Sequence, residues 1–272
     1  MKKTDHCEHR LLLAAAAILL YPSAVWADGS SADQPDADDF GFTVLSNATN
    51  VTHWGLGVGA GIEQEPYKGD GAKFLPIPLV YFDDKWLHVS GTTLDLKIGK
   101  WSNVTFTLRG KYAFDDGYKQ SDAPILNGMD KRSGAFWFGP AFEWRTGLGN
   151  LSGNFLTGGN KGQRAGIDFG QPFDYGNFTV DPHVGAEWLS RKYVDYYYGV
   201  RPSEVRAGRA AYAGKSTYKM SFGVRVDYRL APRQTLIFDV GVARLGSGIT
   251  NSPLVGKKII PQAIFGYQYQ FN

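Results

Sequence analysis

Apolar and polar side chains alternate residue by residue through most of this chain, and that pattern limits the possible folds more than any other feature. The clearest example is 218–230, where apolar residues fill every second position from Tyr218 to Leu230 and residues such as Lys219 and Arg225 fill the positions between. Successive side chains of a β-strand point to opposite faces, so the segment would have one apolar and one charged face. A mean hydropathy of −0.27 excludes a protein built from many membrane-spanning helices.

The length of the alternating segments distinguishes a membrane barrel from a soluble sandwich. Strands that cross a bilayer at a tilt need about ten residues, and aromatic residues at segment ends are typical of the two membrane interfaces. Because lipid offers no partner to backbone polar groups, a spanning sheet must close on itself. Eleven segments fit this description: 54–63, 74–82, 86–98, 103–114, 133–145, 148–157, 163–173, 177–189, 218–230, 234–244 and 259–271.

Bacterial barrels have an even number of strands, and a short twelfth candidate contains Phe40, Phe42 and Val44. We therefore predict a closed antiparallel transmembrane β-barrel of about 12 strands, with 10 as the alternative. A register switch in 86–98 predicts a bulge near Gly91.

Connection lengths suggest how the chain is threaded. Short turns at 146–147, 174–176 and 231–233 would face the periplasm, and long loops at 115–132, 190–217 and 246–258 would face outward. Two connections do not fit this rule, because 64–73 would be a long periplasmic turn and 83–85 a tight outer one.

The first 27 residues are typical of an export signal. Basic residues precede a short apolar run that ends at Pro22, and cleavage is expected after Ala27. Residues 28–39 are predicted to be a flexible periplasmic leader, and residues 40–272 the barrel. The only cysteine, Cys7, would be removed with the signal, so no disulfide or cysteine-ligated metal is expected in the mature chain. The predicted location is the outer membrane of a Gram-negative bacterium, with membrane lipid as a partner.

The polar faces of the strands carry charges of both signs, which we expect to point into the lumen. A polar interior filled by paired charges and a small-solute pore lined by charge both fit this pattern, and the first is slightly favoured. The candidate lumen residues are Arg109, Lys111, Glu143, Asp181, Glu187, Arg225, Asp227 and Arg229.

No catalytic, cofactor-binding or metal-binding residues are expected. His88 and Ser90 share a strand face, as in an outer-membrane lipase, but their neighbours Leu87 and Val89 would face lipid and turn both residues into the lumen. The glycines from Gly55 to Gly61 precede no helix, so a dinucleotide site is excluded and they are expected to leave space inside the barrel. A net charge of +3 does not point to nucleic acid.

Several short motifs, in order, resemble the MipA/OmpV family of MltA-interacting proteins. They include Trp54-Gly55-Leu56-Gly57, Pro66-Tyr67-Lys68-Gly69, Leu126-Asn127-Gly128-Met129, Tyr196-Tyr197-Tyr198-Gly199 and Ser252-Pro253-Leu254-Val255. Tyr196, Tyr197, Tyr198, Gly199, Ser252 and Pro253 are the candidate loop residues of this family motif.

The resemblance implies a non-enzymatic outer-membrane scaffold that links a lytic transglycosylase to a bifunctional penicillin-binding protein, and so a role in peptidoglycan biosynthesis. A small-solute porin and a surface adhesin remain the alternative functions. The residues do not decide between them, and they do not indicate the oligomeric state.

Overall fold

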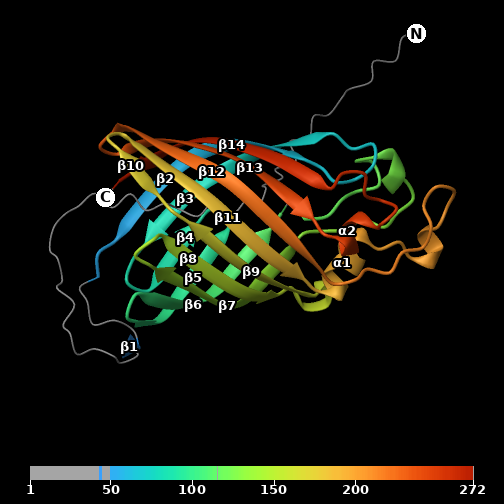
Figure 1. Cartoon of the computed structure of the whole chain (residues 1–272), viewed down its shortest axis with the longest axis horizontal. Coiled ribbons are helices and arrows are strands. Elements are labelled where there is room, and N and C mark those ends of the chain that lie inside the picture. The colour runs from blue at the N-terminus through green and yellow to red at the C-terminus, as the bar shows by residue number, and fades with distance from the viewer. Residues whose placement is uncertain (1–42, 45–49, 115, 272) are drawn as a thin grey trace, which may run out of the picture.

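The computed structural model describes residues 43–44, 50–114 and 116–271, and within them the chain forms a closed antiparallel β-barrel of 12 strands (Figure 1). The prediction of fold class is confirmed. The ring consists of β2 (His53–Gln64), β3 (Ala72–Asp83), β4 (Leu87–Ser90), β5 (Thr93–Trp101), β6 (Val104–Ala113), β7 (Ala135–Arg145), β8 (Asn150–Thr157), β9 (Gln163–Gly170), β11 (Phe178–Leu189), β12 (Thr217–Ala231), β13 (Gln234–Leu245) and β14 (Ile259–Gln270). Two further short strands are not part of the ring: β1 (Thr43–Val44) pairs with β5, and β10 (Phe173–Tyr175) pairs with β11.

The ring closes where β14 pairs with β2, the last strand with the first. At the end of this seam the amide of Phe271 donates to the carbonyl oxygen of Trp54 at 2.9 Å, and the two rings stack with centroids 4.0 Å apart. Closure supplies a partner to backbone groups that hydrocarbon would leave unsatisfied.

The apolar faces of the strands form the outer surface of the barrel, as the alternation requires. Val58, Phe222 and Phe265 are exposed on this surface. On β12, Arg225 and Asp227 occupy positions that alternate with the outward-facing ones, and both are buried. Lipid-facing and lumen-facing residues therefore alternate along the strand. In the described part of the chain, no helix has the length and apolar character to cross a membrane.

The prediction of one strand over 86–98 was wrong, because this segment is a hairpin. Gly91 has φ +56°, a conformation that favours glycine, and the chain reverses there so that Ser90 pairs with Thr93. The switch in apolar parity reflects this reversal and not a bulge near Gly91. The register shift lies instead between Lys97 and Gly99, in the pairing of β5 with β6.

The hairpin also supplies the twelfth strand, which we predict from the sequence near Phe40, Phe42 and Val44. Of that candidate, Phe40 and Phe42 lie outside the described residues, as do the predicted signal 1–27 and leader 28–39. Val44 lies in β1, which pairs with Gly99 and Lys100 of β5, past the residues of β5 that the short β4 pairs with. The predicted strand 163–173 is likewise split, because Pro172 has no amide to donate to a ladder and separates β9 from β10.

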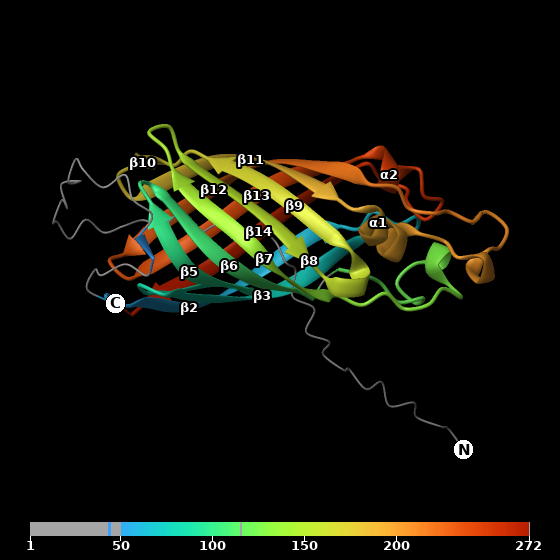
Figure 2. The same cartoon turned by 90° about the horizontal axis from the view of Figure 1, so that it is seen from below.

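The extra hairpin corrects the threading of the first loops. Residues 65–71 now form an outer loop and residues 84–86 a periplasmic turn, so both exceptions to the length rule disappear. The long connections, with α1 (Arg191–Tyr198) and α2 (Ser247–Thr250), gather at one end of the barrel, and β10 lies at the other (Figures 1 and 2). We refer to these as the outer end and the periplasmic end.

One edge of β3 lacks a strand partner along most of its length within the described residues. On the side away from β2, only Tyr81, Phe82 and Asp83 pair with β4. The amide of Gly91 donates to the carbonyl oxygen of Val80, so backbone groups of even-numbered β3 residues face this edge. Pro76 and Pro78 occupy two of those positions and carry no N–H, which is a known way to blunt an open edge.

The space expected beside the glycines of β2 is filled. Leu79 approaches Gly57 and Ile77 approaches Gly59, at 3.1 and 3.6 Å from where a Cβ would lie. Ile77 and Leu79 form a buried cluster with Ile237 and Ile264. This side of the lumen is therefore packed with apolar side chains, and the charged residues lie elsewhere.

Candidate functional site: a capped lumen lined with charge

The outer loops pack into a cap over the barrel. Helix α1 contributes Tyr193, Val194 and Tyr197, which are buried against Trp137 of β7 and Ile249 of α2. The helix begins at Ser190, whose hydroxyl accepts a hydrogen bond from the Tyr193 amide at 3.3 Å, as an N-cap residue does. Burial of whole tyrosine rings shows that this cap is a packed layer.

A second cluster extends the cap over the first loops. Tyr67 of the β2–β3 loop packs with Tyr118, Leu126, Val200 and Leu254 from three other loops. The rings of Tyr67 and Tyr118 meet edge to face, with centroids 5.1 Å apart. Four loops far apart in sequence are thereby joined.

A buried ion pair fastens the cap. Arg132 Nη2 lies 2.9 Å from Glu204 Oε1, and both side chains are almost wholly buried. The Arg132 Nε also donates to the carbonyl oxygen of Tyr196 at 2.8 Å, and backbone amides of Arg201 and Asp130 donate to the Glu204 carboxylate. Burial raises the pKa of Glu204, but these amides and Arg132 outweigh it and the pKa is lowered.

The family-motif residues meet in this cap. Tyr196, Tyr197 and Tyr198 end α1, Gly199 is its C-cap, and the Ser252 hydroxyl donates to the carbonyl oxygen of Tyr198 at 2.6 Å. Pro253 follows in the loop and is partly buried. The motif therefore holds α1 against the β13–β14 loop.

Below the cap, the lumen holds a cavity of about 940 Å³. At the outer end it stops against Tyr67, Tyr193 and Tyr197, which are buried. At the periplasmic end its lining includes exposed residues at strand ends, such as Lys100 and Arg145. The recess therefore faces the periplasm.

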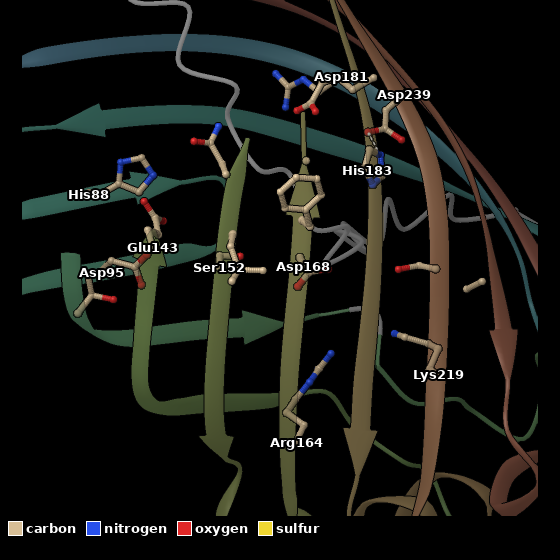
Figure 3. Close-up of a pocket in the computed structure, with 18 of the residues that line it drawn as sticks. His88, Asp95, Glu143, Ser152, Arg164, Asp168, Asp181, His183, Lys219 and Asp239 are labelled. Carbon is tan, nitrogen blue, oxygen red and sulfur yellow. Dashed lines mark ion pairs between the residues drawn. The ribbon is translucent and has the colours of Figure 1, made fainter. Parts of the chain in front are cut away.

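On one wall, the charges of β3 to β7 form two groups, of which Figure 3 labels Asp95, Glu143 and His88. Arg109 holds Asp95 by two bonds, Nε to Oδ1 at 2.8 Å and Nη2 to Oδ2 at 2.7 Å, and Glu143 lies 3.6 Å from the same guanidinium. Such a two-pronged pair fixes orientation as well as charge. In the second group, Asp83 accepts from Lys97 at 2.7 Å and lies 2.9 Å from His88 Nδ1.

On the opposite wall, strands β9 to β13 carry further pairs, with labelled side chains directed into the cavity (Figure 3). Glu187 contacts Arg164 at 2.5 Å and Lys219 at 2.8 Å. His183 Nε2 lies 3.3 Å from Asp239, and Arg225 lies 2.8 Å from Asp227 on its own strand. Many of the lumen charges are therefore paired with a charge of opposite sign.

Most candidate lumen residues lie on the inner faces of the strands. Arg109, Lys111, Asp181, Arg225 and Asp227 are buried there. Glu187 is mostly buried and Glu143 lines the cavity with half its side chain exposed. Arg229 differs, because it is exposed near the periplasmic end of β12.

Sequence reasoning missed two partners of these residues, Asp95 and Arg164, and it placed Lys219 on the charged face of 218–230 without naming it as a candidate. Asp95 lies between Leu94 and Leu96 in strict alternation, but the mistaken single strand over 86–98 hid its inward direction. Arg164 lies at the start of β9, where few apolar neighbours set the phase. Among the residues that the structure describes, no group of three or more acidic, His or Cys side chains is arranged to hold a metal.

The family model described as "MltA-interacting protein MipA" matches residues 56–271. The chain is 24% identical over 242 residues to the "MltA-interacting protein" of Escherichia coli K12, covering 84% of this chain and 96% of that protein. It is 31% identical over 151 residues to "Outer membrane protein Omp26La" of Vibrio anguillarum, and that match covers 54% of this chain but only 59% of the relative.

Solved outer-membrane proteins align with the barrel at low similarity. The NanC porin aligns with a TM-score of 0.41 and 10% identity, over 79% of this chain and 98% of its own. An outer-membrane channel from Pseudomonas putida F1 gives a TM-score of 0.41 and 12% identity, over 87% and 99%. With its barrel, its outward apolar belt and its match to the family model, this chain belongs to the MipA/OmpV family of outer-membrane proteins.

Proposed function

We propose that this protein is a non-enzymatic scaffold of the outer membrane, which binds a murein-processing enzyme at its periplasmic end. The observation that carries the proposal is the difference between the two ends of the barrel. Its outer end is covered by packed loops, and its cavity reaches exposed residues at the periplasmic end. A partner in the periplasm would meet an accessible surface, whereas the outer end offers a closed one.

The periplasmic turns supply apolar contact points for such a partner. Leu148 at the tip of the β7–β8 turn and Tyr175 in β10 are exposed at 73% and 65%. Tyrosine is enriched in binding hot spots, and the exposed leucine adds apolar area beside it. The E. coli relative is named for its interaction with MltA, and a lytic transglycosylase together with a penicillin-binding protein is the partner set we propose.

A pull-down with purified partners tests this proposal. The full-length protein in detergent should retain a lytic transglycosylase, and the double variant Leu148→Glu/Tyr175→Glu should lose most of that binding. The control variant Val205→Glu, at an exposed position of the outer loop, should bind as the wild type does. Equal binding by all three proteins, or by none, would contradict a scaffold that uses this surface.

A gated small-solute channel is the second candidate, and the charge-lined cavity favours it. The wild-type barrel should then show brief conductance events in planar bilayers, because the cap must open for each. Loosening the cap with Arg132→Ala should lengthen them. A complete lack of conductance in both proteins would exclude this function.

A further inference from the structure

The exposed positive charges of the outer end are unevenly distributed around the barrel. Four neighbouring strands, β11 to β14, each have an exposed Lys or Arg at or next to the outer end. We call this set the basic arc: Arg191 and Lys192 after β11, Lys215 before β12, Arg244 near the end of β13, and Lys258 before β14.

The positive charges of the basic arc are not paired with carboxylates of the described residues. Within the described part of the chain, no acidic side chain forms an ion pair with any of its five residues. The loop that joins β11 to β12 contains two carboxylates: Asp195 Oδ1 accepts a hydrogen bond from the Gly214 amide at 2.9 Å, and Glu204 pairs with Arg132 at 2.9 Å. The loops over β2, β3, β6 and β7 differ, because they contain Glu65, Asp70, Asp122 and Asp130 among their cations.

The position of Arg244 places the arc at the surface of the membrane. Arg244 pairs in register with Met220 on one side and Ile259 on the other, and both are about 60% exposed on the outward face of the barrel. Tyr218, one outward position above Met220, is also exposed, as is typical of an interfacial tyrosine. A guanidinium beside this apolar belt can extend into the headgroup layer while its stem remains on the apolar surface.

We infer that the basic arc binds the phosphate groups of phosphorylated lipid headgroups in the outer leaflet. Clustered Lys and Arg beside a membrane surface attract anionic headgroups, and guanidinium groups bind phosphate by paired hydrogen bonds. Four adjacent strands span about 15 Å at the usual strand spacing, which suits one headgroup with two phosphates or two adjoining headgroups. This site lies on the opposite end of the barrel from the proposed scaffold surface and does not depend on it.

The test uses full-length protein refolded in detergent without added lipid, and a bisphosphorylated lipid A as the probe. Binding is measured by native mass spectrometry, and folding by the heat-dependent gel mobility of the barrel. The wild type should retain the probe, and the triple variant Lys215→Gln/Arg244→Gln/Lys258→Gln should bind it at least about tenfold more weakly, since each cation near a charged surface contributes appreciably.

Three comparisons separate specific binding from a net-charge effect. The control variant Lys100→Gln/Lys119→Gln/Lys131→Gln removes the same charge elsewhere and should bind as the wild type does. Dephosphorylated lipid A should bind the wild type weakly, and the single variant Arg244→Lys should retain most of the affinity. Unchanged binding by the arc variant, an equal loss in the control variant, or equal binding of the dephosphorylated probe would overturn the inference.

Discussion

Removing the buried side chain of Arg132 should loosen the outer cap. Its guanidinium contacts Glu204 at 2.9 Å and the carbonyl oxygens of Tyr196 and Asp130 at 2.8 and 3.0 Å. In Arg132→Ala, the buried Glu204 carboxylate keeps only its backbone amide donors. Breaking a buried pair by removing one partner typically costs 3–5 kcal/mol, and the remaining amides place this case near the lower limit, about 3 kcal/mol.

Limited proteolysis of the outer loops measures this loss. A protease cleaves the transiently open cap, so the cleavage rate follows the open population when closing is fast. About 3 kcal/mol corresponds to roughly a 100-fold increase in that population. Arg132→Ala should therefore be cleaved by proteinase K about 100 times faster than the wild type, while the heat-dependent mobility of the barrel stays unchanged.

Arg201→Ala is the matched control for Arg132→Ala. Arg201 also pairs with a carboxylate, Asp130, at 2.8 Å, but both side chains are more than half exposed. An exposed pair contributes at most about 1 kcal/mol, so cleavage should rise less than about fivefold. The double variant Arg132→Ala/Glu204→Gln should recover part of the loss, since it leaves no buried carboxylate without its cation. Equal cleavage rates for Arg132→Ala and Arg201→Ala would refute the reasoning.

Three further predictions concern other parts of the fold. Burial raises the pKa of Tyr118 to about 12, against about 10 in an unfolded chain. Its contribution to cap stability is therefore complete below pH 10 and lost between about pH 10 and 12. The protection factors of outer-loop amides, which correct for the base-catalysed intrinsic exchange rate, should fall over that interval, and constant protection factors would argue against burial. Pro76→Val/Pro78→Val places two donors on the open edge of β3, so cross-linked dimers should increase, and Pro182→Val, on a strand with neighbours on both sides, should leave them unchanged. A Cβ at Gly57 would collide with the carbonyl oxygen of Tyr267, so Gly57→Ala should destabilise the barrel by about 1–3 kcal/mol and lower its unfolding temperature on gels, whereas Gly71→Ala, in open space, should not.

Most of the barrel could be predicted from the sequence because one face of a transmembrane strand meets lipid and the other meets the polar lumen. The alternation along 218–230 specifies which face meets lipid, and β12 follows it from Thr217 to Ala231. The same rule failed over 86–98, because alternation does not distinguish a strand that shifts register from one that turns back. A two-residue turn needs little more than Gly91 at positive φ, and that is a weak signal in a chain with 34 glycines.

The partners of the lumen and cap residues were less predictable than the direction in which each strand residue points. Parity shows that Arg109 points inward, but its partner Asp95 is chosen by the register between β5 and β6. In the same way, Arg132 and Glu204 are 72 residues apart and meet only because two loops fold over the barrel. Pairing across a closed sheet depends on strand stagger, which single-strand patterns do not contain.

The pairing of the lumen charges bears on which function the barrel can perform. A pore that selects ions by charge presents a ring of one sign to the passing solute. In this barrel Asp95, Glu187 and Asp227 each have a cation within 2.8 Å, so neighbouring charges largely cancel. A solute that passed along the lumen would reach a layer of buried tyrosines at the outer end. The pairs Asp95–Arg109 and Glu187–Arg164 also link adjacent strands and stiffen the wall, as the proposed platform for a periplasmic partner would require.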